Sequence, residues 1–150
     1  MNAEECTVRV AGLEDLEQVI QVELQSFNRD EAYPPWVFME AITLHPNLFL
    51  VIECNNSVKG YAMGFVDGDY CHLTSIAVAP DSRRRGFGRR LLRSFEEACR
   101  REGLRRIKLE VKTTNQVALN LYLSEGYRVV DLIRGYYPDG SNAYVMTKDL

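Results

Sequence analysis

A turn rich in arginine and glycine holds the residues best suited to bind a ligand. It lies between an apolar run that ends at Val78 and an amphipathic helical pattern, and arginines flank Gly86 and Gly88. A helix N-terminus leaves its first N–H groups unpaired and carries a partial positive charge, so it favours phosphate. Glycines let the backbone approach such a group closely. The turn therefore predicts a phosphate-binding site.

The charge around this turn contrasts with that of the whole chain. Residues 83–108 hold eleven Lys or Arg and three Glu, whereas the 150-residue chain has a net charge of -3. A compact positive site in an acidic body favours a small anionic ligand over a long polyanion. No direct nucleic-acid partner is therefore expected, and a solvated arginine cluster with two turn glycines remains the alternative.

Two familiar glycine-rich motifs do not fit the turn. A dinucleotide fingerprint needs a third glycine where this chain has Leu91, and a P-loop needs G-x-x-x-x-G-K-[ST], which does not occur. The pattern that is present is Pro80-x-x-Arg83-x-x-Gly86-x-Gly88, after a strand and at the start of a helix.

Hydrophobic periodicity predicts the elements that position this turn. They alternate as β-α-α-β-β-β-α-β-α-β-β along residues 1–150, which predicts one domain of mixed α/β (α+β) class. About seven strands should form a mixed, mostly antiparallel sheet with four helices and a βαβ unit in the middle. The expected strands include 70–78, 106–112, 127–137 and 143–150, and the expected helices include 13–27 and one that stops at Gly103.

The composition excludes several classes of protein. The four cysteines form no C-x-x-C pair and there are two histidines, so no metal site is expected. The first residues lack the apolar segment of a signal peptide, and the apolar runs are too short to span a bilayer. We therefore expect a cytoplasmic protein with reduced thiols and no membrane partner.

The arginine–glycine pattern resembles the acyl-CoA pyrophosphate loop of the GNAT superfamily of N-acetyltransferases. The later stretch "LEVKTTNQVALNLYLSEGY" resembles the other half of that site. The resemblance implies the GNAT fold, with the sheet splayed between its fourth and fifth strands, and acetyl-CoA as co-substrate. The donor contacts that it implies fall on Ile76, Ala77, Val78, Arg83, Arg84, Arg85, Gly86, Phe87, Gly88, Arg89, Asn115 and Tyr122.

The two polar residues of the second stretch suit these roles by their spacing. Asn115 would contact the pantetheine arm and Tyr122 would face the thioester sulfur. They lie seven residues apart, about two helical turns, so both project from one face. Asn115 as a helix N-cap only, and Tyr122 as a core aromatic only, are the alternatives.

Three further stretches resemble protein N-terminal acetyltransferases, including the RimI type and archaeal relatives. They are "AYPPW", "RGYYPDGSNAYVMTKDL" and "LEVKTTN". The resemblance implies that Tyr33, Tyr136 and Tyr137 hold the acceptor peptide and that Glu110 is the general base. Tyrosines suit this role because they combine flat apolar faces with polar tips. Loop packing for Tyr33, and a core position for one of the strand tyrosines, are the alternatives.

These residues suggest direct transfer without an acyl-enzyme. Glu110, through a water, would deprotonate the acceptor, backbone N–H groups near Val78 would hold the thioester, and Tyr122 would protonate the thiolate. Glu110 could instead face solvent or pair with a neighbouring lysine. His72 is the alternative base, and a ping-pong route through Cys71 is the least favoured.

The expected function is acetyl transfer from acetyl-CoA to the α-amino group of a peptide or protein N-terminus. One alternative is a GNAT enzyme that acetylates a small amine, a polyamine or a lysine side chain. Another is a non-catalytic acyl-CoA-binding subunit, which would not need a leaving-group acid such as Tyr122.

Overall fold

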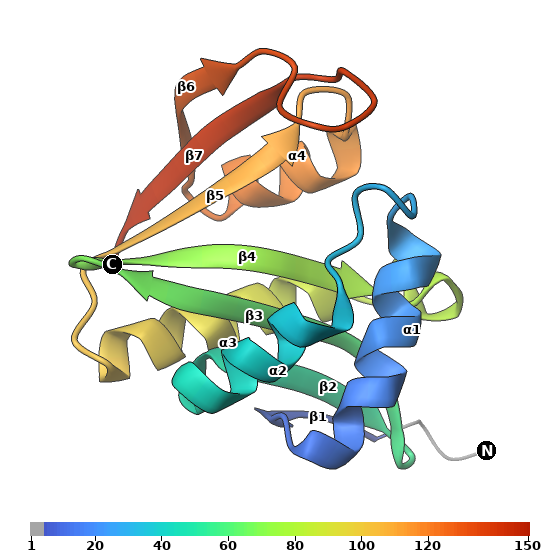
Figure 1. Cartoon of the computed structure of the whole chain (residues 1–150). Coiled ribbons are helices and arrows are strands. Elements are labelled where there is room, and N and C mark those ends of the chain that lie inside the picture. Colours follow the sequence, from blue (N-terminus) through green and yellow to red (C-terminus); the bar gives the residue numbers. More distant parts are fainter. Residues whose placement is uncertain (1–4) are drawn as a thin grey trace.

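The computed structural model describes residues 5–150, and its strands form one twisted sheet (Figure 1). The order across the sheet is β1-β2-β3-β4-β5-β7-β6. Each neighbouring pair is antiparallel except β4 and β5, which are parallel. The strands are β1 (Cys6–Val10), β2 (Phe49–Cys54), β3 (Ser57–Asp67), β4 (Tyr70–Val78), β5 (Arg106–Lys112), β6 (Arg128–Ile133) and β7 (Ala143–Asp149).

Helices cover both faces of this sheet. On the β1–β4 half, α1 and α2 lie on one face and α3 lies on the other, while α4 packs beside β5 and β7 (Figure 1). The helices are α1 (Leu16–Ser26), α2 (Pro35–Leu44), α3 (Phe87–Arg101) and α4 (Gln116–Ser124). The predicted element order, strand number and mixed sheet are confirmed.

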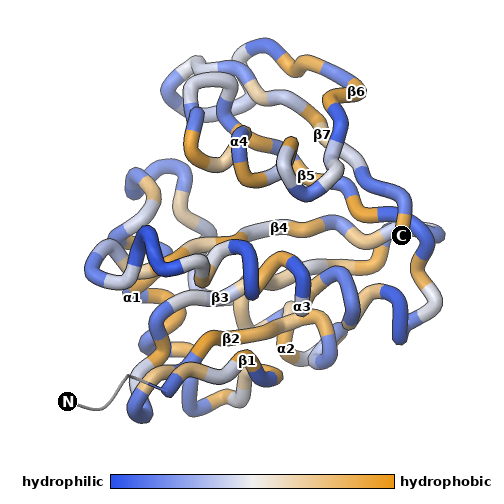
Figure 2. The backbone as a smooth tube through the Cα atoms, turned by 180° about the vertical axis from the view of Figure 1, so that it is seen from behind, coloured by the Kyte–Doolittle hydropathy of each residue, from blue (hydrophilic) through white to orange (hydrophobic). Residues whose placement is uncertain are grey.

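The two faces of the sheet bury separate hydrophobic cores. One core joins α3 and α4 to the sheet and contains Leu92, Phe95 and Met146. The other lies under α1 and α2 and contains Val19, Phe38 and Phe49. In Figure 2, β2 is largely hydrophobic, as expected for a strand covered on both faces.

The two halves of the sheet meet over a short distance. β4 and β5 pair only from Tyr70 opposite Arg106 to His72 opposite Lys108. Beyond this point β4 continues along β3 and β5 continues along β7, so the two strands diverge (Figure 1). The splay expected between the fourth and fifth strands is therefore confirmed, and it opens a wedge between the two halves.

The sixth strand is shorter than expected. The strand expected to run to Tyr137 ends at Ile133, because Gly135 adopts φ +64° and donates its N–H to Asn142 Oδ1, which starts a loop. Tyr136 and Tyr137 therefore lie in the loop before β7.

The expectation of reduced thiols is also wrong for one pair of cysteines. Cys6 and Cys54 lie directly opposite each other on β1 and β2 and form a disulfide. That register brings the two side chains together, although the residues are 48 positions apart in the sequence. Cys71 and Cys99 are free and buried. Within residues 5–150, every helix is too short or too polar to cross a bilayer.

Candidate active site

A cavity of about 1140 Å³ opens in the wedge between β4 and β5. It runs from the turn before α3, along β4 and α4, to the loops before α2 and before β7. The residues predicted to contact the donor and the acceptor all line this cavity except Arg85, and Glu110 lines it as well; His72 and Cys71, the alternatives considered for the chemistry, do not line it. The guanidinium of Arg85 lies over the ring of Phe87, 4.6 Å from its centroid.

The turn before α3 forms one end of the cavity. Gly86 caps the helix with φ +77°, and none of the described residues places a heavy atom within 4 Å of where its Cβ would lie. The first N–H groups of α3, from Phe87 onward, have no partner inside the helix. Arg84 also has a positive φ, +63°, and lines the cavity. The backbone here is thus shaped to receive an anion.

Two of the arginines have structural partners as well. Arg83 donates to Val78 O at 3.1 Å and to Ser26 Oγ at 3.3 Å. Arg89 donates to Ser124 Oγ and lies 3.1 Å from Glu125. These contacts fix the turn against α1, β4 and α4. An anion at this end of the cavity would therefore meet backbone N–H groups as well as side-chain charge.

The middle of the cavity lies between β4 and α4. Ile76, Ala77 and Val78 supply one wall from the part of β4 that has left β5. Asn115 and Tyr122 supply the other. Asn115 Oδ1 also accepts the N–H of Ala118 at 3.2 Å, so this residue is an N-cap and a wall residue at once.

Tyr122 is almost fully buried, with 6% of its surface exposed. Its ring packs against Tyr127 at a centroid distance of 5.7 Å. Burial raises the pKa of Tyr122 above its ordinary value, so its hydroxyl keeps its proton throughout the neutral range.

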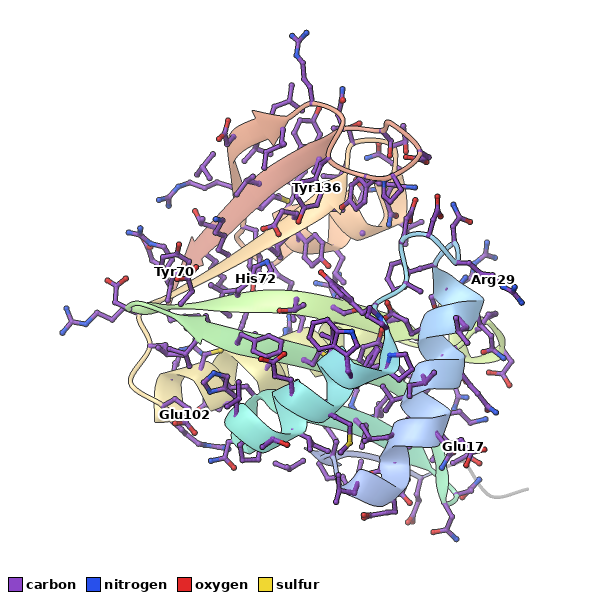
Figure 3. The ribbon with its side chains drawn as sticks, in the orientation of Figure 1. Glu17, Arg29, Tyr70, His72, Glu102 and Tyr136 are labelled. Carbon is purple, nitrogen blue, oxygen red and sulfur yellow. A yellow bond between two sulfur atoms is a disulfide. The ribbon has the colours of Figure 1, made fainter. Side chains whose placement is uncertain are left out.

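Glu110 lies at the vertex of the wedge and meets two donors. Its Oε1 is 2.8 Å from His72 Nε2 and 3.1 Å from the hydroxyl of Tyr136. Its Oε2 is buried and has no hydrogen-bond partner among the described residues. Figure 3 shows His72 on β4 and Tyr136 above it, on opposite sides of the wedge.

The protonation of Glu110 follows from these contacts. Burial alone would raise its pKa, but the hydrogen bonds from His72 and Tyr136 and the nearby charge of Lys108 outweigh burial. The pKa of Glu110 therefore lies below its ordinary value, and the group is a carboxylate at neutral pH. One alternative considered from the sequence, that Glu110 faces solvent, is wrong, because Glu110 contacts His72 and Tyr136.

Three tyrosines form the rim at this end. Tyr33, Tyr136 and Tyr137 all line the cavity, and the last two rings meet edge to face at 4.9 Å. Burial, reinforced by nearby carboxylates and tyrosines, raises the pKa of each of the three. They therefore offer neutral hydroxyls and flat ring faces to a ligand.

Sequence reasoning missed two features of this end. Glu23 is buried, lines the cavity and lies one helical turn after the buried Val19. A carboxylate on the apolar face of α1 was the signal that could have found it. Lys112 bridges Glu31, before α2, and Asp139, before β7. That bridge depends on two loops meeting in space, and no local pattern reports it.

The cavity has opposite charges at its two ends. Arg83, Arg84 and Arg89 line the end at α3. Three carboxylates and one cation line the end at the tyrosine rim: Glu23, Glu31, Glu110 and Lys112. Such an arrangement suits an anionic group at one end and a cationic group at the other. The wall between them leads from the anion site directly to the Glu110 carboxylate.

Comparison with known proteins agrees with this geometry. An N-alpha-acetyltransferase of Sulfurisphaera tokodaii is 31% identical over 97% of this chain and 94% of its own length. The N-alpha-acetyltransferase RimI of Mycobacterium tuberculosis is 32% identical over 99% of this chain and 95% of its own. The crystal structure of Ard1 from Thermoplasma volcanium superposes with a TM-score of 0.90 at 27% identity, covering 97% of each chain.

The sequence profile of the Acetyltransferase (GNAT) family matches residues 13–127. This span includes the turn before α3, the diverging strands and Tyr122. The chain belongs to the acetyltransferase (GNAT) family and is an acetyl-CoA-dependent N-acetyltransferase.

Proposed function

We propose that the chain transfers the acetyl group of acetyl-CoA to the α-amino group of a peptide or protein N-terminus. One observation carries this proposal: a single cavity joins the anion-binding turn to Glu110, beneath a rim of three tyrosines. The relatives named N-alpha-acetyltransferase support the same acceptor. An extended peptide backbone suits a rim of flat rings with hydroxyl tips.

We infer that the donor lies along the cavity from α3 to Tyr122. The N–H groups at the start of α3 would bind its diphosphate, and the separated stretch of β4 from Ile76 to Val78 would hold the thioester. The acceptor then enters beneath the tyrosines, with its amine beside Glu110. Holding both reactants in one cavity is worth up to about 7–11 kcal/mol in well-oriented cases.

Glu110 suits the role of base because of how its two oxygens are used. Oε1 accepts from His72 and Tyr136, which orient the carboxylate, while Oε2 has no partner among residues 5–150. An α-ammonium has a pKa near ~7.7–8, so a carboxylate acting through a water is sufficient to deprotonate a useful fraction of the acceptor amines. His72 then acts as the residue that holds Glu110.

A panel of peptides that vary in their first two residues tests the acceptor. Each is incubated with the chain and acetyl-CoA, and mass spectrometry locates the added acetyl group. Acetylation of the α-amine, with an N-acetylated decoy left unmodified, is the expected result. Acetyl groups found only on lysine side chains, or transfer only to small amines, would contradict the proposal.

Replacing Tyr122 with phenylalanine is expected to slow turnover about 10- to 100-fold, because a hydrogen bond to a charged group is worth ~1.5–3 kcal/mol. The hydroxyl would stabilise the departing thiolate. Acetyl-CoA affinity should stay within about twofold, since the ring remains. Steady-state kinetics and calorimetry measure the two effects.

The neighbouring Tyr127 provides the matched control. It is buried, its hydroxyl donates to Glu96 at 2.8 Å, and it does not line the cavity. Tyr127→Phe should lower stability without changing kcat. Equal kcat values for the two variants would remove Tyr122 from the chemistry.

Replacing Lys112 with methionine is expected to raise KM for the peptide about threefold to fivefold with little change in KM for acetyl-CoA. The substitution removes both ion pairs that join the loop before α2 to the loop before β7. Partly exposed pairs contribute about 0.2–1 kcal/mol each. Arg106→Met is the control, because Arg106 lies on the same strand as Lys112, β5, and pairs with Asp149 on β7, away from the cavity. An unchanged peptide KM in Lys112→Met would show that the bridge does not shape the acceptor site.

A further inference from the structure

Glu23 is a buried ionisable group at the cavity that the proposed chemistry leaves unused. Only 1% of its surface is exposed, and it lines the acceptor end of the cavity. Burial raises its pKa above the ordinary value, although hydrogen bonds from Tyr33 N–H and Ser75 oppose this effect. Burying a carboxylate costs free energy unless its oxygens accept hydrogen bonds, so the partners of Glu23 show what stabilises it there.

Glu23 accepts hydrogen bonds from three different elements. Oε2 accepts the backbone N–H of Tyr33, in the loop before α2, at 3.0 Å. Oε1 accepts the hydroxyl of Ser75 on β4 at 2.9 Å and the hydroxyl of Tyr61 on β3. One side chain on α1 thus joins the loop that carries Tyr33 to β3 and β4 beneath it.

The position of these contacts along β4 links them to the reaction. Ser75 immediately precedes Ile76, where β4 lines the cavity. Thr74 is the unpaired residue where the β3–β4 register shifts, so the backbone of β4 is irregular just before the proposed thioester wall. Glu23 therefore fixes Tyr33 relative to the strand on which the donor would lie.

We propose that Glu23 is a positioning residue for the acceptor peptide. It holds Tyr33, which lines the cavity, at a fixed position relative to β4. It acts through the Tyr33 backbone and takes no part in proton transfer. This inference rests on the proposed function for its kinetic consequence, but the structural link that it describes does not depend on which amine is the acceptor.

Glu23→Met is the decisive variant, because methionine keeps the volume of the side chain and removes both acceptors. Tyr61 and Ser75 lie 2.8 Å apart and can still bond each other, so the Tyr33 N–H is the group that loses its partner. The variant should still fold, because methionine fills a similar volume and the two hydroxyls keep each other as partners. Glu23→Gln is the rescue variant, since its amide oxygen can still accept from Tyr33 and its NH₂ can donate to the hydroxyls.

In Glu23→Met we expect KM for the peptide to rise about tenfold, with KM for acetyl-CoA unchanged. Hydrogen exchange measured by mass spectrometry should accelerate across residues 28–34. Glu23→Gln should recover most of both losses. Tyr61→Phe is the control: it deletes a bond to the same carboxylate on the floor side, so it should lower the melting temperature and leave peptide KM and loop exchange unchanged.

A double-mutant cycle separates positioning from general destabilisation. If Glu23 acts through Tyr33, the effects of Glu23→Met and Tyr33→Ala on peptide KM will not add. Additive effects, or unchanged exchange across residues 28–34 in Glu23→Met, would overturn the inference. A chain that acetylates small amines but no peptide would contradict the proposed function instead, and loop exchange would still decide the role of Glu23.

Discussion

Replacing Glu110 with glutamine is expected to lower kcat about 10²–10⁴-fold, the usual contribution of a general base. Glutamine is nearly the same size and can still accept from His72 and Tyr136, so the wedge should keep its shape. What the variant loses is the basic oxygen, Oε2, which has no partner among the described residues. Calorimetry should show acetyl-CoA affinity within about twofold of the unchanged chain.

The pH dependence gives this prediction a second readout. Because the pKa of Glu110 is lowered, the carboxylate is present throughout pH 6–9, and its contribution to stability is lost only as the pH falls through that lowered value. The rise of kcat/KM toward pH ~8 should then report the acceptor ammonium. In Glu110→Gln the rate should be lower at every pH in this range.

Turnover that survives in Glu110→Gln and disappears in His72→Ala would assign the base to His72. His72 Nε2 lies only 2.8 Å from Glu110 Oε1, so distance cannot separate the roles of the two residues. The kinetics of the single variants must do so. If Glu110→Gln loses far more turnover than His72→Ala while both variants still bind acetyl-CoA, Glu110 is the base and His72 holds it.

Replacing Gly86 with valine is expected to weaken acetyl-CoA binding about 10²–10³-fold. A β-branched residue at φ +77° is strained by roughly 1–2 kcal/mol. Its side chain would also lie where the donor diphosphate approaches, which costs at least one charge-assisted hydrogen bond of ~1.5–3 kcal/mol. Calorimetric titration with coenzyme A measures the loss directly.

The opposite end of the same helix offers a closely matched control. Gly103 follows α3 with φ +78°, and, like Gly86, its Cβ position has no described heavy atom within 4 Å. Gly103→Val should therefore suffer similar backbone strain far from the turn before α3. If both variants bind coenzyme A equally well, the turn is not the diphosphate site.

Much of this architecture could be predicted from local sequence patterns. The helical spacing of Leu91, Leu92 and Phe95, with glycines at both ends, indicated α3 and the glycine turn before it. Strand alternation also predicts that Cys71 and His72 lie on opposite faces of β4, and in the structure Cys71 is buried while His72 contacts Glu110. These features are set by residues close together in the chain, where periodicity and backbone freedom decide the outcome.

Local patterns could not predict the contacts between residues that are far apart in the sequence. The Cys6–Cys54 disulfide follows from which residues β1 and β2 place opposite each other, and the network of Glu23 follows from α1 lying over β3 and β4. The bridge of Lys112 requires two loops to converge. In each case the partners are far apart in the sequence, so only the assembled fold reveals them.

The short junction between β4 and β5 also determines which parts of the cavity would move most if the two halves of the sheet changed their angle. The last paired residues are His72 and Lys108, and Glu110 follows two positions later, so the His72–Glu110 contact sits almost at the pivot. A small change in the angle between the two halves of the sheet displaces atoms in proportion to their distance from that pivot. Such a change would therefore widen the part of the cavity beside Asn115 and Gly88 while it moved Glu110 and His72 least.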